Sequence, residues 1–299
     1  MNRRNYFFLA VLALIVVISM QALSQSKKNE IRQISDLNYV DGHNYFQQLD
    51  LYLPPSAASR KLPLIVWIHG GAWRYGDKSD TPALVFAKAG YAVASLNYRL
   101  SDKASFPAQI NDCKAAIRWL RAHADDYGLD SKKIGAFGMS AGGHLVALLG
   151  ATNDDKHFDC GPNLKYSSSV QAVCDWCGPT DMFTLAEQAP DGCQIKWRGA
   201  ESPLILFLGG APESVSALAK MASPALLVKA GAPPCLIMHG DKDDVVPYAQ
   251  SQELFAALKK CKNDVRLVPV KNAAHNFATP ENLKLVLEFF DEKLNAMKN

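Results

Sequence analysis

The 299-residue chain has little excess of charge of either sign, which argues against several classes of partner. Its 32 Lys and Arg residues stand against 29 Asp and Glu residues, a formal net charge of +3. Two of the basic residues, Arg3 and Arg4, lie in the first 24 residues, which contain no acidic residue, so residues 25–299 carry 30 basic against 29 acidic residues. A body this close to neutral lacks the basic surface that nucleic acids and anionic membranes require. We therefore expect neither of these partners.

Long hydrophobic runs are missing as well, except for one near the N-terminus. Residues 7–18 are apolar, follow Arg3 and Arg4, and precede Ala22-Leu23-Ser24. This order is typical of a secretory signal over residues 1–24, and it predicts cleavage before Gln25 and export to the periplasm or the medium. The alternative is an uncleaved anchor, but this run is shorter than the roughly 20 apolar residues that span a bilayer as a helix. We expect no membrane association after cleavage.

Cysteine and histidine pairs at metal-ligand spacing are also lacking. The seven cysteines and seven histidines do not repeat in pairs at zinc spacing, which argues against a zinc site. We predict no metal site, and we expect no cofactor. Export permits disulfides, and the odd number of cysteines leaves at least one thiol free. Cys174 and Cys177 form a C-x-x-C pair within a strand-like run, where residues three apart are too distant to bridge. A disulfide from Cys160 to Cys193 or Cys174 is one possible pairing.

What the chain does contain is a regular alternation of two kinds of segment. Short apolar runs bounded by Gly, Pro or charge alternate with amphipathic stretches at helical spacing, such as 110–120 and 283–294. The apolar runs are 64–68, 91–96, 134–137, 170–173, 236–238 and 265–270, and residues 31–53 resemble antiparallel strands that lead in. This pattern predicts a single α/β domain over residues 25–299, with a mostly parallel twisted sheet and helices on both faces. Residues 180–222 interrupt the alternation with Gly and Pro, which predicts a small cap-like insertion.

A serine flanked by glycines is the first candidate catalytic residue. The segment Gly138-Met139-Ser140-Ala141-Gly142 follows the run 134–137 and opens an Ala- and Leu-rich helix. At a sharp strand-to-helix corner, glycines two residues before and after the serine avoid clashes of Cβ atoms with neighbouring backbone. The hydroxyl then stands over the carboxyl edge of the sheet, where the helix N-terminus faces a developing anion. The alternative is an ordinary corner in which Ser140 caps the helix.

A second glycine-rich turn follows the run 64–68 directly, with the sequence His69-Gly70-Gly71-Ala72-Trp73. Together with the serine corner, this turn resembles the α/β-hydrolase superfamily. The resemblance implies an α/β-hydrolase fold, Ser140 as nucleophile, and an oxyanion hole formed by the backbone N–H groups of Ala141 and of Gly71 or Ala72. Lipase-like relatives commonly have a third glycine at position 72, and alanine there keeps the N–H group. The alternative is a glycine-rich turn without a catalytic role.

The general base must be a histidine, because a serine hydroxyl does not attack at neutral pH unaided. In the superfamily the residues follow the order serine, acid, histidine. His275 lies in a loop between the last strand and the last helix, where a base belongs, so we predict that it activates Ser140. The other histidines after Ser140 have less suitable places: His144 in the next helix, His157 in a charged loop, and His239 at a strand end beside the acid-bearing turn.

The acid is expected on the loop after the penultimate strand. There the segment His-Gly-Asp-Lys-Asp-Asp-Val-Val-Pro, residues 239–247, offers three carboxylates. The segment resembles a hydrolase pattern in which the fifth residue is the acid, and this implies Asp243. Asp241 and Asp244 would then cap the turn or face solvent.

Further motifs narrow the resemblance to one group of esterases. The strings are Gly76-Asp77-Lys78, Asn97-Tyr98-Arg99, Gly142-Gly143-His144 and Gly178-Pro179-Thr180-Asp181. Over roughly residues 36–295 the chain is similar to esterases grouped with bifunctional feruloyl and acetyl-xylan esterases. The resemblance implies a secreted serine carboxylesterase that acts on a small ester or on an ester linked to a polysaccharide. Trp73 and Trp197 are candidates to line its acyl or sugar pocket, or else are packing anchors.

Two other functions compete with the esterase. A serine peptidase of the prolyl-oligopeptidase type shares the triad but usually carries a propeller domain, for which this chain is too short. A non-catalytic binding module on a hydrolase scaffold is the second, since a fold does not by itself prove an activity. Such modules generally lack a triad member, whereas all three are present here. No oligomeric state follows from the sequence.

Overall fold

The computed structural model describes residues 30–55, 61–153 and 155–295. The predicted secretory signal, residues 1–24, therefore lies outside the described residues. Within the described part of the chain, no helix is long and apolar enough to cross a membrane.

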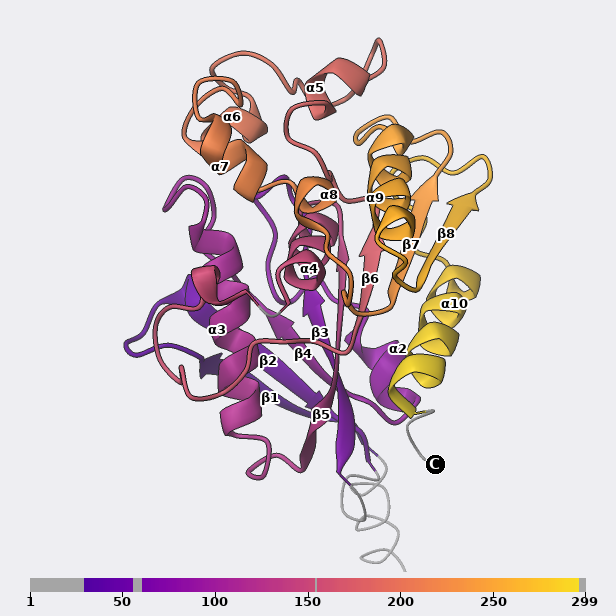
Figure 1. The fold of residues 1–299 in the computed structure, drawn as a ribbon. Helices are drawn as coiled ribbons and strands as arrows, with labels where there is room; N and C mark the ends of the chain where they lie inside the picture. Colours follow the sequence, from indigo (N-terminus) through magenta and orange to yellow (C-terminus); the bar gives the residue numbers. More distant parts are fainter. Residues whose placement is uncertain (1–29, 56–60, 154, 296–299) are drawn as a thin grey trace, which may run out of the picture.

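One sheet of eight strands runs through the molecule in the order β1-β2-β4-β3-β5-β6-β7-β8 (Figure 1). The pairs β1–β2 and β2–β4 are antiparallel, and every other neighbouring pair is parallel. The strands are β1 (Arg32–Asn38), β2 (Gln48–Leu53), β3 (Leu62–Ile68), β4 (Ala92–Leu96), β5 (Leu129–Met139), β6 (Ala172–Trp176), β7 (Cys235–Gly240) and β8 (Val265–Val270). The predicted mostly parallel sheet with an antiparallel lead-in is confirmed.

The central strands form where the sequence is continuously apolar because both faces of the sheet are covered. Every residue of β3, β4, β6 and β7 is buried. Side chains alternate between the faces, so that in β3 Val66 and Ile68 join one core while Ile65 and Trp67 join the other. Pro269 lies in β8, the last strand of the sheet, where its missing N–H group is tolerated.

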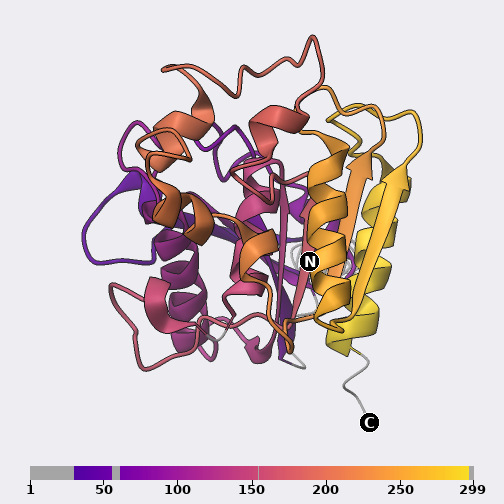
Figure 2. The same cartoon turned by 45° about the horizontal axis from the view of Figure 1, so that its top comes forward.

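Helices cover both faces of this sheet (Figures 1 and 2). One core contains apolar residues of α3 (Ala108–Ala122), α4 (Ala141–Ala151) and α9 (Tyr248–Lys260). The other contains those of α2 (Ala83–Lys88) and α10 (Pro280–Phe290). Short single turns are η1 (Tyr45–Gln47), η2 (Lys156–Phe158) and η3 (Asp291–Asn295). The two stretches with helical spacing are therefore helices: residues 110–120 lie in α3, and residues 283–294 lie in α10 and η3.

The segment predicted to be a cap-like insertion lies between β6 and β7, over the carboxyl ends of the strands (Figures 1 and 2). It contains α5 (Leu185–Gln188), α6 (Pro203–Leu208) and α7 (Ser216–Met221), and α8 (Pro224–Leu227) leads back to β7. Its residues Leu185, Trp197 and Phe207 belong to the same core cluster as α3 and α4. The insertion is therefore packed onto the domain.

All seven cysteines are free thiols, so the disulfide from Cys160 to Cys193 or Cys174 is wrong. Cys160 lies exposed in the loop after η2, whereas Cys174 is buried inside β6 and Cys193 lies in the cap segment. The three candidates belong to different layers of the molecule, and their order along the sequence does not reveal this.

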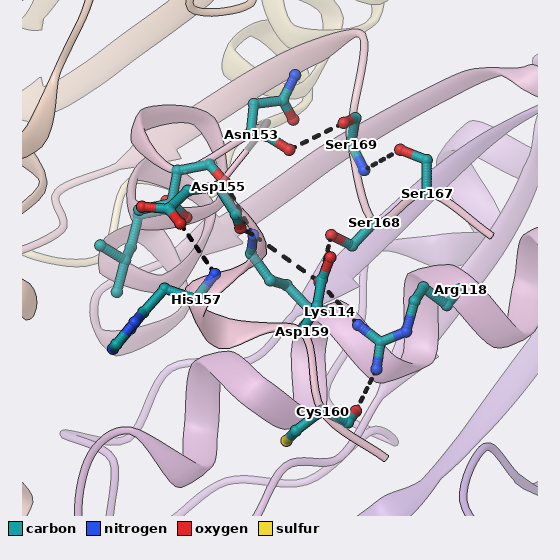
Figure 3. Close-up of polar contacts among 12 residues, drawn as sticks. Lys114, Arg118, Asn153, Asp155, His157, Asp159, Cys160, Ser167, Ser168 and Ser169 are labelled. Atoms are coloured by element: carbon teal, nitrogen blue, oxygen red, sulfur yellow. Dashed lines mark hydrogen bonds and ion pairs between the residues drawn. The ribbon is translucent and has the colours of Figure 1, made fainter. Parts of the chain in front are cut away.

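Two basic residues of α3 are buried and hold the loop that follows α4 in place (Figure 3). Lys114 Nζ donates to the carbonyl oxygens of Thr152 (2.8 Å) and Asp155 (2.7 Å). Arg118 Nη1 donates to Asp159 Oδ1 at 2.8 Å, and the same oxygen lies 4.0 Å from Lys114 Nζ. Because a buried cation needs a compensating anion, Asp159 is the electrostatic anchor of this loop.

We expect Asp159→Ala to lower the free energy of unfolding by about 3 kcal/mol, because it removes the carboxylate that faces the buried Arg118. Urea denaturation measures this loss. The matched control is Asp102→Ala, which removes an ion pair with Lys103 whose side chains are 56% and 51% exposed. Asp102→Ala should lower the free energy of unfolding by less than about 1 kcal/mol. Equal losses in the two variants would contradict the anchoring role.

Candidate active site

Ser140 stands at the corner between β5 and α4 in a strained conformation. Its backbone has φ 58° and ψ −122°, a region that costs a non-glycine residue about 1–3 kcal/mol. The hydroxyl makes no capping hydrogen bond to α4, which excludes the ordinary capped corner. The backbone is held on both sides, since Ser140 N–H donates to the carbonyl of Trp176 at 2.7 Å and Ser140 O accepts from His144 N–H at 2.9 Å.

Close packing of backbone explains the glycines around the serine. A Cβ atom on Gly142 would lie 2.0 Å from the carbonyl oxygen of Ile68, at the end of β3. A Cβ atom on Gly138 would lie 2.4 Å from the carbonyl oxygen of Gly142. Both distances are far below any van der Waals contact, so the corner can press against β3 only if these residues are glycine.

Gly142→Ala is therefore expected to lower the free energy of unfolding by about 3 kcal/mol or more and to abolish the ester hydrolysis that the sequence predicts. Gly150→Ala on the same helix is the matched control, because its Cβ would lie 3.3 Å from a side-chain methyl of Val173. That variant should change the free energy of unfolding by less than about 1 kcal/mol. Thermal denaturation and ester turnover compare the two, and similar behaviour would refute the clash.

The glycine-rich turn after β3 lies against this corner. A Cβ atom on Gly70 would approach Met139 O to 3.0 Å and Ser140 Cβ to 3.3 Å. The next residues adopt left-handed backbone, with φ 106° at Gly71, 51° at Ala72 and 58° at Trp73. Glycine is the natural residue for such a turn, so Ala72 is tolerated at some cost in strain.

The predicted oxyanion donors lie around Ser140 with their N–H groups available. Within the described part of the chain, the N–H groups of Gly71 and Ala72 have no hydrogen-bond acceptor. Ala141 is the first residue of α4, where helix N–H groups have no intrahelical partner. Gly71 and Ala72 line the cavity described below, whereas the side chain of Ala141 is buried beside it. These donors remain predictions that fit the geometry.

Asp243 and His275 are hydrogen-bonded to each other. His275 Nδ1 lies 2.8 Å from Asp243 Oδ2, which places a proton on Nδ1 and leaves Nε2 as the basic nitrogen. The second oxygen, Oδ1, accepts the backbone N–H groups of Val245 (2.8 Å) and Val246 (2.9 Å). Burial alone would raise the pKa of Asp243, but hydrogen bonds from His239 and His275 outweigh it and hold that pKa well below its usual range.

The two other acids of this turn are engaged elsewhere. Asp241 Oδ1 accepts the N–H group of Asn272 at 2.7 Å. Asp244 Oδ2 accepts from Gln194 Nε2 of the cap segment at 2.5 Å. The structure thus brings Asp243, and neither neighbour, to His275.

His239 contributes a second imidazole to the same carboxylate. Its Nε2 lies 3.1 Å from Asp243 Oδ2 and 3.0 Å from the carbonyl oxygen of Val246. Two acceptors at one nitrogen require a proton there, so the ring donates to Asp243 while Nδ1 faces Ser251 Oγ at 2.7 Å. The sequence predicted only that His239 packs beside this turn, and its contact with the acid was missed.

Ser140 and His275 line one cavity of about 750 Å³. The turn residues Gly71 and Ala72 line it as well, and the His275 side chain is 18% exposed there. An aromatic wall comes from the carboxyl ends of three neighbouring strands, with Trp67 of β3, Phe137 of β5 and Trp176 of β6. A hydroxyl, an imidazole paired with a carboxylate, and free N–H groups thus border one space large enough for a small-molecule substrate.

Trp73 and Trp197 do not line this cavity, and their assignment to the substrate pocket is wrong. Trp73 is fully buried, stacks on Phe207 at 4.3 Å, and donates from Nε1 to His144 Nδ1 at 3.1 Å. Trp197 is 4% exposed and donates from Nε1 to the carbonyl of Val245 at 2.9 Å. Both indoles find their partners on the core side of the cap, so they are packing anchors.

A family model adds evidence independent of this geometry. The model for BD-FAE matches residues 49–258, which include Ser140 and Asp243. The chain belongs to the BD-FAE family. Within it, the serine corner and the acid turn fall in the matched region, and the loop of His275 follows it.

Relatives of this BD-FAE chain are named as esterases. It is 32% identical to Esterase LipQ of Mycobacterium tuberculosis over 82% of this chain and 57% of that protein. A truncated form of a carbohydrate esterase from gut microbiota has 31% identity and a TM-score of 0.80, over 90% of this chain and 98% of that one. A bifunctional GH43-CE protein of Bacteroides eggerthii has 34% identity and a TM-score of 0.77, over 87% of this chain and 38% of that one. This chain spans little more than half the length of the curated relatives it matches.

Proposed function

We propose that this BD-FAE protein is a serine carboxylesterase that works through an acyl-enzyme on Ser140. The observation that carries the proposal is the meeting, around one cavity, of a strained serine, a histidine 2.8 Å from a buried carboxylate, and two backbone N–H groups that have no acceptor among the described residues. Relatives named as esterases support the same reading. Side chains and backbone of this chain would supply the nucleophile, the base, the orienting carboxylate and the oxyanion donors, and water would be the second reactant.

The proposed reaction begins when His275 Nε2 accepts the proton of the Ser140 hydroxyl as its oxygen attacks the ester carbonyl. The N–H groups of Ala141 and of Gly71 or Ala72 stabilise the negative oxygen of the tetrahedral intermediate. His275 then returns the proton to the leaving alcohol, and water repeats the sequence on the acyl-enzyme. Asp243 holds the ring in the required tautomer and stabilises its charged form.

The substrate we propose is an acetyl or feruloyl ester of a plant polysaccharide, met by a secreted enzyme. The aromatic wall of Trp67, Phe137 and Trp176 supports an aromatic acyl group, because aromatic rings bind preferentially against one another. The carbohydrate-esterase relatives support a sugar on the alcohol side. Export rests on the predicted signal over residues 1–24, and N-terminal sequencing of the exported protein should begin at Gln25.

A panel of substrates tests the proposal. The panel compares acetylated xylan, feruloylated sugars, p-nitrophenyl esters of rising acyl length and amides of proline-containing peptides. We expect turnover of the esters and labelling of the protein by a fluorophosphonate probe, which reacts with an activated serine. Faster cleavage of proline peptides would favour a peptidase, and failure to label would favour a binding module.

A further inference from the structure

A buried cysteine lies directly beneath the proposed acid and base. Cys177 follows β6, is fully buried, and has a left-handed backbone with φ 46°, which is unusual for a residue with a side chain. Its N–H group donates to the carbonyl of Met238 at 2.9 Å. Its thiol donates to the backbone carbonyl of His275 at 3.6 Å. The proposed esterase reaction does not use this thiol.

Three side chains of different ligand types converge at this point. One sulfur, nitrogen or oxygen atom from each of Cys177, Asp243 and His275 lies within 4.8 Å of the other two. In a tetrahedral zinc site the ligands are about 2.0–2.3 Å from the metal, which puts ligand atoms about 3.3–3.8 Å apart. Shifts of about 1 Å would therefore make this cluster a three-ligand site with a fourth position for water. A thiolate, an imidazole and a carboxylate are the ligands that zinc takes in proteins.

We propose that Cys177, Asp243 and His275 form an inhibitory site for a thiophilic divalent cation, with Zn²⁺ as the representative ion. On binding, the thiol of Cys177 loses its proton to solvent and a metal–sulfur bond forms. His275 binds through Nδ1, the nitrogen that faces Asp243, and the proton of Nδ1 is replaced by one on Nε2. One proton is released for each cation bound, and no oxidation or reduction takes place.

The change of tautomer explains why the cation inhibits. A neutral imidazole bound to metal through Nδ1 carries its proton on Nε2, so Nε2 no longer accepts the proton of Ser140. Asp243 is engaged by the cation at the same time and no longer orients the ring. Of the three ligands, His275 lines the cavity, so the proposed route of the cation to the cluster runs past this side chain. Inhibition as a readout rests on the proposed esterase function, whereas cation binding does not.

Titration with Zn²⁺ and Cd²⁺ tests the site in the full-length protein and two cysteine variants. We expect one cation per chain at this site, and Cd²⁺ should produce the ultraviolet absorption of a cadmium–thiolate bond. Cys177→Ala should keep its hydrolysis in the absence of cation, lose that absorption, and weaken inhibition by Zn²⁺ about a hundredfold or more, since even indirect partners of a metal contribute about 10- to 100-fold. Mg²⁺ and Ca²⁺ should have no effect because they prefer oxygen ligands.

Cys174→Ala is the matched control, because Cys174 is equally buried on β6 but lies outside the cluster. This variant should bind Cd²⁺ and respond to Zn²⁺ as the unmodified protein does. Cys177→Ser is a second variant that keeps a side chain of similar size, in case alanine disturbs the fold. Zn²⁺ inhibition that is unchanged in both Cys177 variants, or no cadmium–thiolate absorption in the unmodified protein, would overturn the proposal. Absence of ester hydrolysis with normal cadmium–thiolate absorption would instead refute the esterase and leave the cation site standing.

Discussion

Replacing Ser140 with alanine is expected to lower kcat for ester hydrolysis by about 10⁶-fold, because the nucleophile of the acyl-enzyme is lost. The residual rate would come from substrate binding and the oxyanion donors alone. The fold should persist, since the Ser140 hydroxyl makes no capping hydrogen bond and alanine adds no atoms to the tight corner. Steady-state kinetics on a p-nitrophenyl ester, with a stopped assay sensitive enough for slow turnover, measures the loss.

Ser79→Ala provides the control for this loss. Ser79 is an exposed serine in the segment before α2, and it has no part in the proposed reaction. It should leave both kcat and labelling by the fluorophosphonate probe unchanged, whereas Ser140→Ala should abolish labelling. A Ser140→Ala protein that still labels or keeps substantial turnover would show that another residue is the nucleophile.

The architecture could be predicted from the sequence because buried parallel strands are apolar along their whole length. The end of β6 does not follow this rule. The sequence placed this strand at 170–173, but it runs over Ala172–Trp176 and includes Asp175. A charged residue ordinarily indicates the end of a buried strand, yet Asp175 is fully buried and accepts the N–H group of Gly178 at 2.9 Å. That partner lies in the turn directly after the strand, whereas the burial of the carboxylate against α4 is a tertiary contact that the local sequence does not reveal, since a Cβ atom on Gly143 would lie 2.4 Å from Asp175 Oδ1.

The sequence predicts those residues of the candidate site whose positions are determined by the local backbone. Ser140 is indicated by the glycines that its sharp corner requires, and His275 by its place in the loop before the last helix. The aromatic residues were misjudged for a physical reason. Trp73 follows a glycine turn, but left-handed backbone at three consecutive residues decides where its side chain points, and it points into the core. Trp67 and Phe137 meet only because β3 and β5 are neighbours in the sheet.

The acid is the residue that the sequence left least determined, since three carboxylates share one turn. The structure makes a sharp prediction, which is that Asp243→Asn lowers kcat by about 10⁴-fold with little change in KM. The Asp243 side chain faces four donors, namely the N–H groups of Val245 and Val246 and the rings of His239 and His275. An asparagine has only one acceptor oxygen. If that oxygen takes the two backbone N–H groups, its NH₂ group points at both imidazoles.

That NH₂ group would drive the proton of His275 from Nδ1 to Nε2, and a ring with a proton on Nε2 does not accept one from Ser140. Asp244→Asn is the matched control. The Asp244 side chain accepts a hydrogen bond from Gln194 of the cap, and an asparagine at this position keeps an oxygen that accepts the same bond. In this variant kcat should fall by less than about tenfold, because a typical hydrogen bond contributes only about 1 kcal/mol. Kinetics of both variants on one ester substrate, with thermal denaturation to confirm folding, decides the assignment. A larger loss of kcat in Asp244→Asn than in Asp243→Asn would identify Asp244 as the acid and contradict a triad of Ser140, Asp243 and His275.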